Sequence, residues 1–154
     1  MGTNEMDLQE LAGLAALDGC TRRELSELDG RVTELRIRAG RTICHQGARA
    51  QEVLILLDGF ATRTRGGGEL AGQVGPGTIL GGAEVADGRP HETTVTTRSV
   101  ARILVLGTAD YADLRAVAPG LAGRLAGVVP PTVAGRPERE PRPALLPQMG
   151  FLPA

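Results

Sequence analysis

The chain of 154 residues contains no lysine and no tryptophan, and it has only two cysteines. All 17 of its cationic side chains are therefore arginines. The absence of lysine removes the Schiff-base and phosphate-binding lysines that several classes of enzyme require. Cys20 and Cys44 are too few for a disulfide framework or for a cysteine-rich zinc site.

An excess of charge and a long apolar run are also missing. With 17 cationic and 18 acidic side chains the formal net charge is −1, which gives no general attraction to nucleic acid or to an anionic membrane. No apolar run has the length that spans a bilayer, and the polar, acidic segment of residues 1–9 does not resemble a signal peptide. We therefore expect a soluble, cytoplasmic protein that binds neither DNA nor membranes.

Glycine and proline are abundant, with 22 and 10 residues, and the apolar fraction of 42% is enough for a folded core. Glycine inside a helix costs about 0.5–1 kcal/mol relative to alanine, so this composition argues against a helical bundle. Twenty of the glycines lie in residues 1–129, whereas seven of the prolines lie after residue 129. The chain is therefore expected to form one domain over residues 1–129, followed by an extended, Pro-rich tail over residues 130–154.

The periodicity of apolar residues predicts short helices on both sides of a β-rich middle. We expect helices over residues 5–17, between Thr21 and Gly30, from Thr108 to Pro119, and over residues 121–129. Thr21 and Glu24 fit a capping box, and Thr108 is expected to be an N-cap. Strands are expected at residues 32–38, 42–46, 53–57, 60–65, 69–74, 94–97 and 100–106.

Two segments of the β-rich middle are especially informative. Residues 53–57 form a continuous apolar run, which predicts a strand buried on both faces, and residues 66–68 are three glycines suited to a hairpin tip. Seven or eight short strands about ten residues apart favour a jelly roll or barrel, in a mainly β fold with flanking helices (α+β).

Particular residues make this order of elements more specific. Gly40 with Gln46-Gly47, then residues 53–59 (Val-Leu-Ile-Leu-Leu-Asp-Gly), then residues 74–77 (Val-Gly-Pro-Gly) closely resemble the cyclic nucleotide-binding domain. That domain is the effector fold of the catabolite activator family, of cyclic nucleotide-dependent kinases and of gated channels. The resemblance covers about residues 8–129 and implies a β-roll with a regulatory, non-catalytic role.

The resemblance also implies a phosphate-binding cassette. The family's cassette reads Phe-Gly-Glu-x-Ala-Leu, a short spacer and Pro-Arg-x-Ala-Thr-Val, and residues 80–85, 86–89 and 90–95 match these parts. In the family, backbone N–H groups at the start of a short helix face the cyclic phosphate, the Glu accepts from the ribose hydroxyl, and the Arg clamps the phosphate. The candidate ligand-binding residues are Gly81, Gly82, Ala83, Glu84, Arg89, His91, Glu92, Thr93 and Thr94.

This sequence departs from the cassette at both key positions. Gly82 stands where the family has Glu, His91 stands where it has Arg, and Glu92 adds a carboxylate that would repel an anion. The loss of two bonds with charged groups costs roughly 3–6 kcal/mol, or about a hundred- to ten-thousand-fold in affinity. Arg89 is either a substitute for the missing arginine or a solvated turn residue. The resemblance suggests no cofactor other than a cyclic nucleotide, and the departures argue against that ligand in the family's Glu–Arg mode.

Other reactive side chains give weaker signals. His45 and His91 with Glu84 lack the closely spaced histidine pair of a cupin metal site, so we expect no metal. Cys44 is expected to be a small edge or core residue, and Cys20 precedes a helix start, where the pKa of a thiol can fall. No nucleophile, base or paired-carboxylate arrangement is recognisable, so we do not expect an enzyme.

Two functions remain open at this point. In the first, the domain is an interaction module that engages a protein partner or a larger assembly partly through its tail. Pro130 and Pro131 would end the helix that leads to a DNA reader in the transcription-factor branch. The tail instead ends in a hydrophobic cluster, whose candidate partner-binding residues are Leu145, Leu146, Met149, Phe151 and Leu152. In the second, the chain is a stand-alone sensor that binds a cyclic nucleotide or another small anion between residues 81 and 95.

Overall fold

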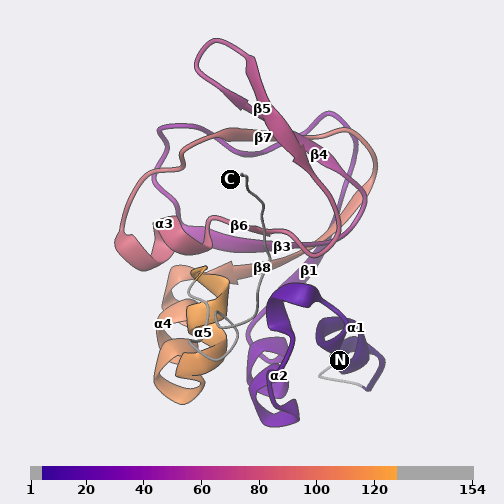
Figure 1. Cartoon of the computed structure of the whole chain (residues 1–154), viewed down its shortest axis with the longest axis vertical. Coiled ribbons are helices and arrows are strands. Elements are labelled where there is room, and N and C mark those ends of the chain that lie inside the picture. Colours follow the sequence, from indigo (N-terminus) through magenta and orange to yellow (C-terminus); the bar gives the residue numbers. More distant parts are fainter. Residues whose placement is uncertain (1–4, 128–154) are drawn as a thin grey trace, which may run out of the picture.

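The computed structural model describes residues 5–127, with side chains from Leu8 on. Eight strands form two antiparallel sheets that face each other, with short helices beside them (Figure 1). The predicted β-roll with flanking helices is thereby confirmed. The predicted tail of residues 130–154 lies outside the described residues, as do its five candidate partner-binding side chains.

The first sheet has the strand order β1-β8-β3-β6. Its strands are β1 (Thr33–Ile37), β8 (Ala101–Gly107), β3 (Glu52–Asp58) and β6 (Ile79–Leu80). The second sheet has the order β2-β7-β4-β5. Its strands are β2 (Thr42–Cys44), β7 (Thr94–Thr97), β4 (Ala61–Arg65) and β5 (Glu69–Val74). The predicted glycine tip of residues 66–68 joins β4 to β5 as an antiparallel hairpin.

Strand β3 lies between two hydrophobic cores because successive side chains of a strand point to opposite faces. Val53 and Ile55 pack into the core shared with the helices, whereas Leu54 and Leu56 pack into the core between the two sheets. All four side chains are buried. The prediction that this run is buried on both faces is therefore confirmed.

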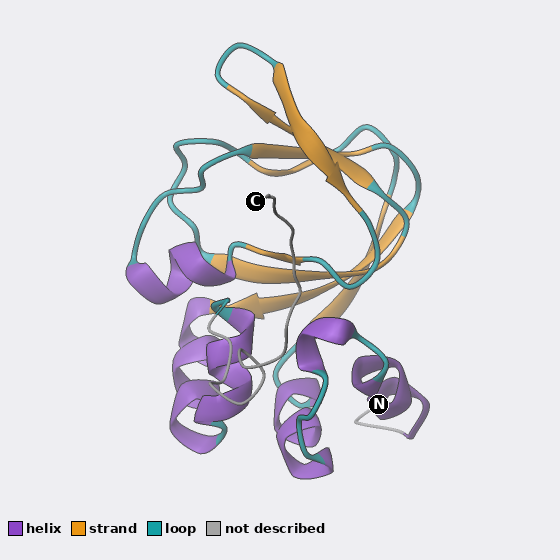
Figure 2. Ribbon diagram, viewed as in Figure 1, coloured by secondary structure: helices purple, strands orange, loops and turns teal. Residues whose placement is uncertain are grey.

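The helices other than α3 gather on the outer face of the first sheet (Figure 2). They are α1 (Glu5–Ala12), the 3₁₀ helix η1 (Ala15–Leu17), α2 (Arg22–Asp29), α4 (Thr108–Val117) and α5 (Pro119–Leu125). Helix α3 (Gly82–Asp87) instead follows β6 at one end of the roll. The predicted capping box of α2 is confirmed, since the Thr21 hydroxyl accepts from the Glu24 N–H at 3.0 Å and the Glu24 carboxylate accepts from the Thr21 N–H at 2.8 Å.

Three predicted helix boundaries are wrong. The single helix expected over residues 5–17 is split into α1 and η1 at Gly13, whose N–H closes the last turn of α1 on the carbonyls of Gln9 and Glu10. Gly107, rather than Thr108, is the N-cap of α4. Pro119 begins α5, because its fixed φ suits the first helical turn, and this helix ends at Leu125.

Two strand predictions also need correction. Strand β1 was expected to be half-buried, but its side chains are mostly exposed, and Leu35 retains 42% of its surface. The short strand β6 was not predicted, because Leu80 was assigned to the cassette and Ile79 to no element. No helix within residues 5–127 is long and apolar enough to cross a membrane.

Candidate functional site

Two glycines set the geometry of the segment that matches the cassette. Gly81 has a φ of +80°, and a β-carbon there would lie 2.8 Å from the carbonyl oxygen of Glu52, so only glycine fits this corner. Helix α3 then begins at Gly82 and ends before Gly88, whose φ is +70°. The short helix expected at the start of the cassette is therefore present.

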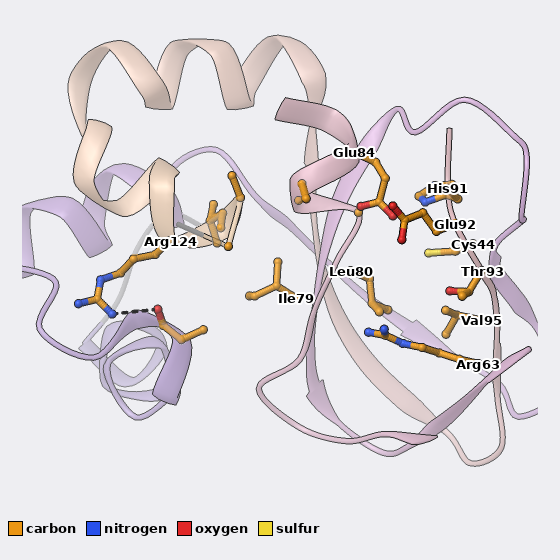
Figure 3. A pocket seen from close by; sticks show the side chains of 17 residues that line it. Cys44, Arg63, Ile79, Leu80, Glu84, His91, Glu92, Thr93, Val95 and Arg124 are labelled. Carbon is orange, nitrogen blue, oxygen red and sulfur yellow. Dashed lines mark hydrogen bonds between the residues drawn. The ribbon is translucent and has the colours of Figure 1, made fainter. Parts of the chain in front are cut away.

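A pocket of about 420 Å³ lies between this segment and the end of α5 (Figure 3). Seven of the nine predicted ligand-binding residues line it, namely Gly81, Gly82, Ala83, Glu84, His91, Glu92 and Thr93. Its volume falls within the range of about 300–1,000 Å³ that is typical of small-molecule sites. Arg89 and Thr94 are not among the lining residues, and the Thr94 hydroxyl instead accepts a hydrogen bond of 3.0 Å from the Gln46 N–H.

The position of the family's glutamate is covered by the last helix. Gly82 is buried, and the carbonyl oxygen of Leu125 lies so close to it that a β-carbon on Gly82 would overlap that oxygen. The backbone of α5 can approach α3 only because Gly82 has no side chain. A glutamate at this position would have to displace Leu125, which is itself buried.

The position of the family's arginine carries no guanidinium. The backbone of His91 is fixed by two hydrogen bonds of 2.9 Å, because its N–H donates to Ala48 and its carbonyl accepts from Gly47. The Arg89 guanidinium donates to the carboxylates of Glu92 at 2.7 Å and of Asp87 at 3.2 Å. These hydrogen bonds, first that with Glu92, raise the pKa of Arg89. Arg89 is therefore a turn residue paired with its neighbours and does not replace the missing arginine.

Another arginine lines the pocket from the opposite sheet. Arg63 extends from β4, and its Nε is buried without a hydrogen-bond partner. Val95 on β7 pairs with Arg63 on one side and with Cys44 of β2 on the other, so the three residues form a row across the second sheet. Because paired residues share a face of a sheet, all three side chains line the same wall of the pocket.

Cys44 is a buried member of this row. Burial is the main reason that the pKa of its thiol is raised to about 12, and the nearby Glu84 carboxylate adds to this effect. Arg63 acts in the opposite direction and lowers the pKa of Cys44. The thiol is therefore un-ionised at neutral pH, and the prediction of Cys44 as a small core residue is confirmed.

The pKa of the Cys20 thiol differs from the sequence-based expectation. Partial burial, followed by the charge of Glu24, raises the pKa of this thiol instead of lowering it. Its position before α2 does not make it a reactive thiolate. Within residues 5–127 no group of three or more His, Cys, Asp or Glu side chains is arranged to hold a metal ion.

Sequence analysis missed the part of the pocket that comes from outside the cassette. Arg63, Cys44, Arg124 and the end of α5 all line it. One signal was available for Arg63, because it lies two residues after the buried Ala61 and therefore points to the same inner face of its strand. The approach of α5 had no signal in local sequence, since it depends on tertiary packing.

Comparisons with known proteins agree with this geometry. A family model described as "Cyclic nucleotide-binding domain" matches residues 34–117, whereas a comparison with curated protein sequences gives no match. The regulatory domain of protein kinase A from Toxoplasma gondii, solved with cAMP, is similar, with a TM-score of 0.69 and 18% identity. This similarity covers 79% of the chain and 47% of the Toxoplasma chain, so the present chain spans less than half of that protein.

Two further solved structures are similar in fold. The N-terminal domain of a transcriptional regulator from Streptomyces coelicolor has a TM-score of 0.65 and 22% identity, over 75% of this chain and 86% of that one. The regulatory subunit of a cAMP-independent protein kinase A from Trypanosoma cruzi, bound to guanosine, has a TM-score of 0.68 and 16% identity. That similarity covers 77% of this chain and 42% of the Trypanosoma chain.

Proposed function

The chain belongs to the cyclic nucleotide-binding domain family, and on this premise we propose that it is a non-catalytic regulatory module that does not bind cyclic AMP through the family's Glu–Arg mechanism. The contact between Gly82 and the carbonyl of Leu125 carries the proposal, because it places backbone where the family's glutamate would stand. His91 and the Arg89–Glu92 pair support it, since neither offers a guanidinium to a phosphate in the pocket.

Calorimetric titration of the full chain with cyclic AMP and cyclic GMP tests this proposal. We expect no saturable heat at ligand concentrations that saturate a protein kinase A regulatory domain measured in parallel. His91→Arg alone should not restore tight binding, because Leu125 still covers Gly82. Wild-type binding as tight as that of the parallel domain, weakened by His91→Ala, would overturn the proposal.

We further propose that the regulatory output passes to a protein partner or a larger assembly, partly through the tail. This part rests on the sequence of the tail, in which a charged, Pro-rich spacer precedes a hydrophobic cluster between residues 145 and 152. Such a spacer can present a short apolar segment to a partner at a distance from the domain.

A second candidate function is that of a small-molecule sensor, and the pocket itself favours it. Seven of the predicted ligand-binding residues line a volume suited to a small ligand. The Trypanosoma cruzi structure is that of the regulatory subunit of a cAMP-independent protein kinase A, bound to guanosine, a nucleoside without a phosphate. This neighbour supports the idea that the fold can take a ligand that does not require a phosphate clamp.

A further inference from the structure

The charges that line the pocket fall into two groups. Glu92 accepts a hydrogen bond from Arg89 at 2.7 Å, and Arg124 donates one of 3.3 Å to the carbonyl oxygen of Ala16. The side chains of Arg63 and Glu84 form no hydrogen bond or ion pair with any described residue. Among the described residues, the pocket therefore holds one guanidinium and one carboxylate whose side chains have neither a hydrogen-bond partner nor an ion-pair partner.

These two side chains enter the pocket from different elements. Arg63 comes from β4 in the second sheet, and Glu84 comes from helix α3. In the right-hand cluster of side chains in Figure 3, the carboxylates of Glu84 and Glu92 lie at the top and the guanidinium of Arg63 lies at the bottom. No salt bridge joins Arg63 to Glu84, although both side chains line the same pocket. A molecule in the pocket can therefore contact both charges at once.

Burial of the Nε atom of Arg63, in a side chain that is otherwise half-buried, gives this arrangement its significance. A buried guanidinium N–H without an acceptor carries a desolvation penalty, and such groups in native proteins usually have an acceptor that is water or a ligand. A carboxylate on the ligand would satisfy the Arg63 fork with charge-assisted hydrogen bonds.

Part of the pocket wall beside Arg63 is apolar. The row that runs from Cys44 through Val95 to Arg63 spans three neighbouring strands, which are about 4.8 Å apart at each step. Cys44 and Val95 are both buried, and the Cys44 thiol is neutral at physiological pH. This wall suits methylene groups better than a sugar hydroxyl.

We propose that the pocket binds a small zwitterion, whose carboxylate pairs with Arg63 and whose ammonium group pairs with Glu84. The proposal rests on the sensor function described above and names the chemical class of its ligand. The order of charges is opposite to that of the family's cassette, where the anionic group of the ligand lies beside the short helix. In this chain the end beside α3 is negative, because Glu84 has no cationic partner among the described residues, whereas Glu92 is paired with Arg89.

The test is a titration of the full chain with ω-amino acids of increasing length, namely glycine, 4-aminobutyrate and 6-aminohexanoate. Hexanoate and hexylamine serve as single-charge controls for the longest probe. We expect saturable binding of at least one of the two longer zwitterions. Calorimetry and changes in NMR chemical shift at Cys44 and Val95 measure this binding. Each single-charge control should bind about 10- to 100-fold more weakly, since it lacks one charged hydrogen bond.

Variants assign the two ends of the ligand. Arg63→Met should reduce the affinity for the zwitterion about tenfold or more while leaving the affinity for hexylamine unchanged. Glu84→Gln should reduce the affinity for the zwitterion by a similar factor while leaving the affinity for hexanoate unchanged. Arg65→Met is the matched control, because Arg65 lies on the same strand but is exposed at the hairpin. Circular dichroism establishes that each variant is folded, and Arg63→Gln replaces Arg63→Met if the latter is not.

The outcomes are separable from those of the proposed function. The zwitterion site is overturned if no zwitterion binds at millimolar concentration, or if neither Arg63→Met nor Glu84→Gln changes binding. This holds even when cyclic AMP shows no binding, as the proposed function expects. Tight binding of cyclic AMP with no zwitterion binding would overturn both proposals. Zwitterion binding that both variants weaken supports this proposal.

Discussion

The carbonyl oxygen of Leu125 lies against Gly82, so the last turn of α5 and the first turn of α3 meet backbone to backbone. The negative, C-terminal end of α5 therefore meets the positive, N-terminal end of α3 at the position where the family has its glutamate. The residue that removes the family's glutamate is thus the same residue that permits this contact.

Gly82→Ala should destabilise the fold through overpacking. The new methyl group overlaps the Leu125 carbonyl, and the free energy of unfolding should fall by about 1–3 kcal/mol. Chemical denaturation measures this change. Gly67→Ala is the matched control, because a β-carbon at Gly67 meets nothing within 4 Å and its φ is not positive, so its effect should be small. Equal effects of the two substitutions would contradict the proposed contact.

The Cys44 thiol should make stability depend on alkaline pH. Its pKa is raised to about 12 in the folded chain, so the native state retains a proton that the unfolded state loses above about pH 8.5. The resulting stabilisation is fully present below that pH and is lost as the pH rises towards 12, at up to about 1.4 kcal/mol per pH unit. Denaturation of the wild type and of Cys44→Ala at pH 7.5, 9 and 10 measures the difference. An unchanged difference across this range would contradict the assignment.

The same burial should protect Cys44 from thiol reagents. At pH 8 a pKa of about 12 leaves roughly one thiol in ten thousand ionised, against about one in four for a free cysteine. Reaction with iodoacetamide, followed by mass spectrometry, should therefore modify Cys20 before Cys44, and denaturant should make the two rates equal. Rapid native labelling of Cys44 would contradict its buried position.

Arg102 should hold helix α1 against the first sheet. Its guanidinium donates to Glu10 of α1 at 2.9 and 3.1 Å and to Glu34 of β1 at 2.9 Å, and these hydrogen bonds, first that with Glu10, raise the pKa of Arg102. Because the three side chains are partly exposed, we expect Arg102→Met to cost only about 1 kcal/mol, and less at high salt. A double-mutant cycle with Glu10→Gln isolates the coupling, and additive effects of the two substitutions would argue against it.

The hydrophobic end of the tail should be required for partner binding. Phe151→Ser should weaken co-purification with a cross-linked native partner, because the substitution removes the largest apolar side chain of the cluster, whereas Gln148→Ser serves as the matched polar control. Deletion of residues 143–154 should have at least the effect of Phe151→Ser. Retention of the same partners by the deletion variant would reject this role of the tail.

The β-roll was predictable because its signals are local. The unbroken apolar run of β3, the glycine tip between β4 and β5, and the capping box at Thr21 each correspond to one structural requirement. The boundaries near Gly13 and Pro119 were less predictable, because a helical period continues across both residues while backbone geometry interrupts it. The exposure of Leu35 could not be predicted either, since it depends on what packs against an edge strand.

The candidate site was predicted only on its cassette side. Its linear motif gave seven lining residues, because they are adjacent in sequence. Arg63 and Leu125 reach the pocket through sheet pairing and helix packing, which short-range patterns do not contain. The positions of the two charges in the pocket depend on α3, which carries Glu84, and on β4, which carries Arg63, so only the folded chain shows them.

Strand β3, which supplies side chains to both hydrophobic cores, has a consequence for how the domain opens. Its backbone is paired on one side with β8 and on the other with β6, which leads directly to Gly81 and the pocket. Neither core can lose its packing without exposing part of the other, so the helical layer and the roll should unfold together as one cooperative unit. The amide hydrogens of Leu54 and Ile55 should accordingly exchange with solvent only at the rate of global unfolding.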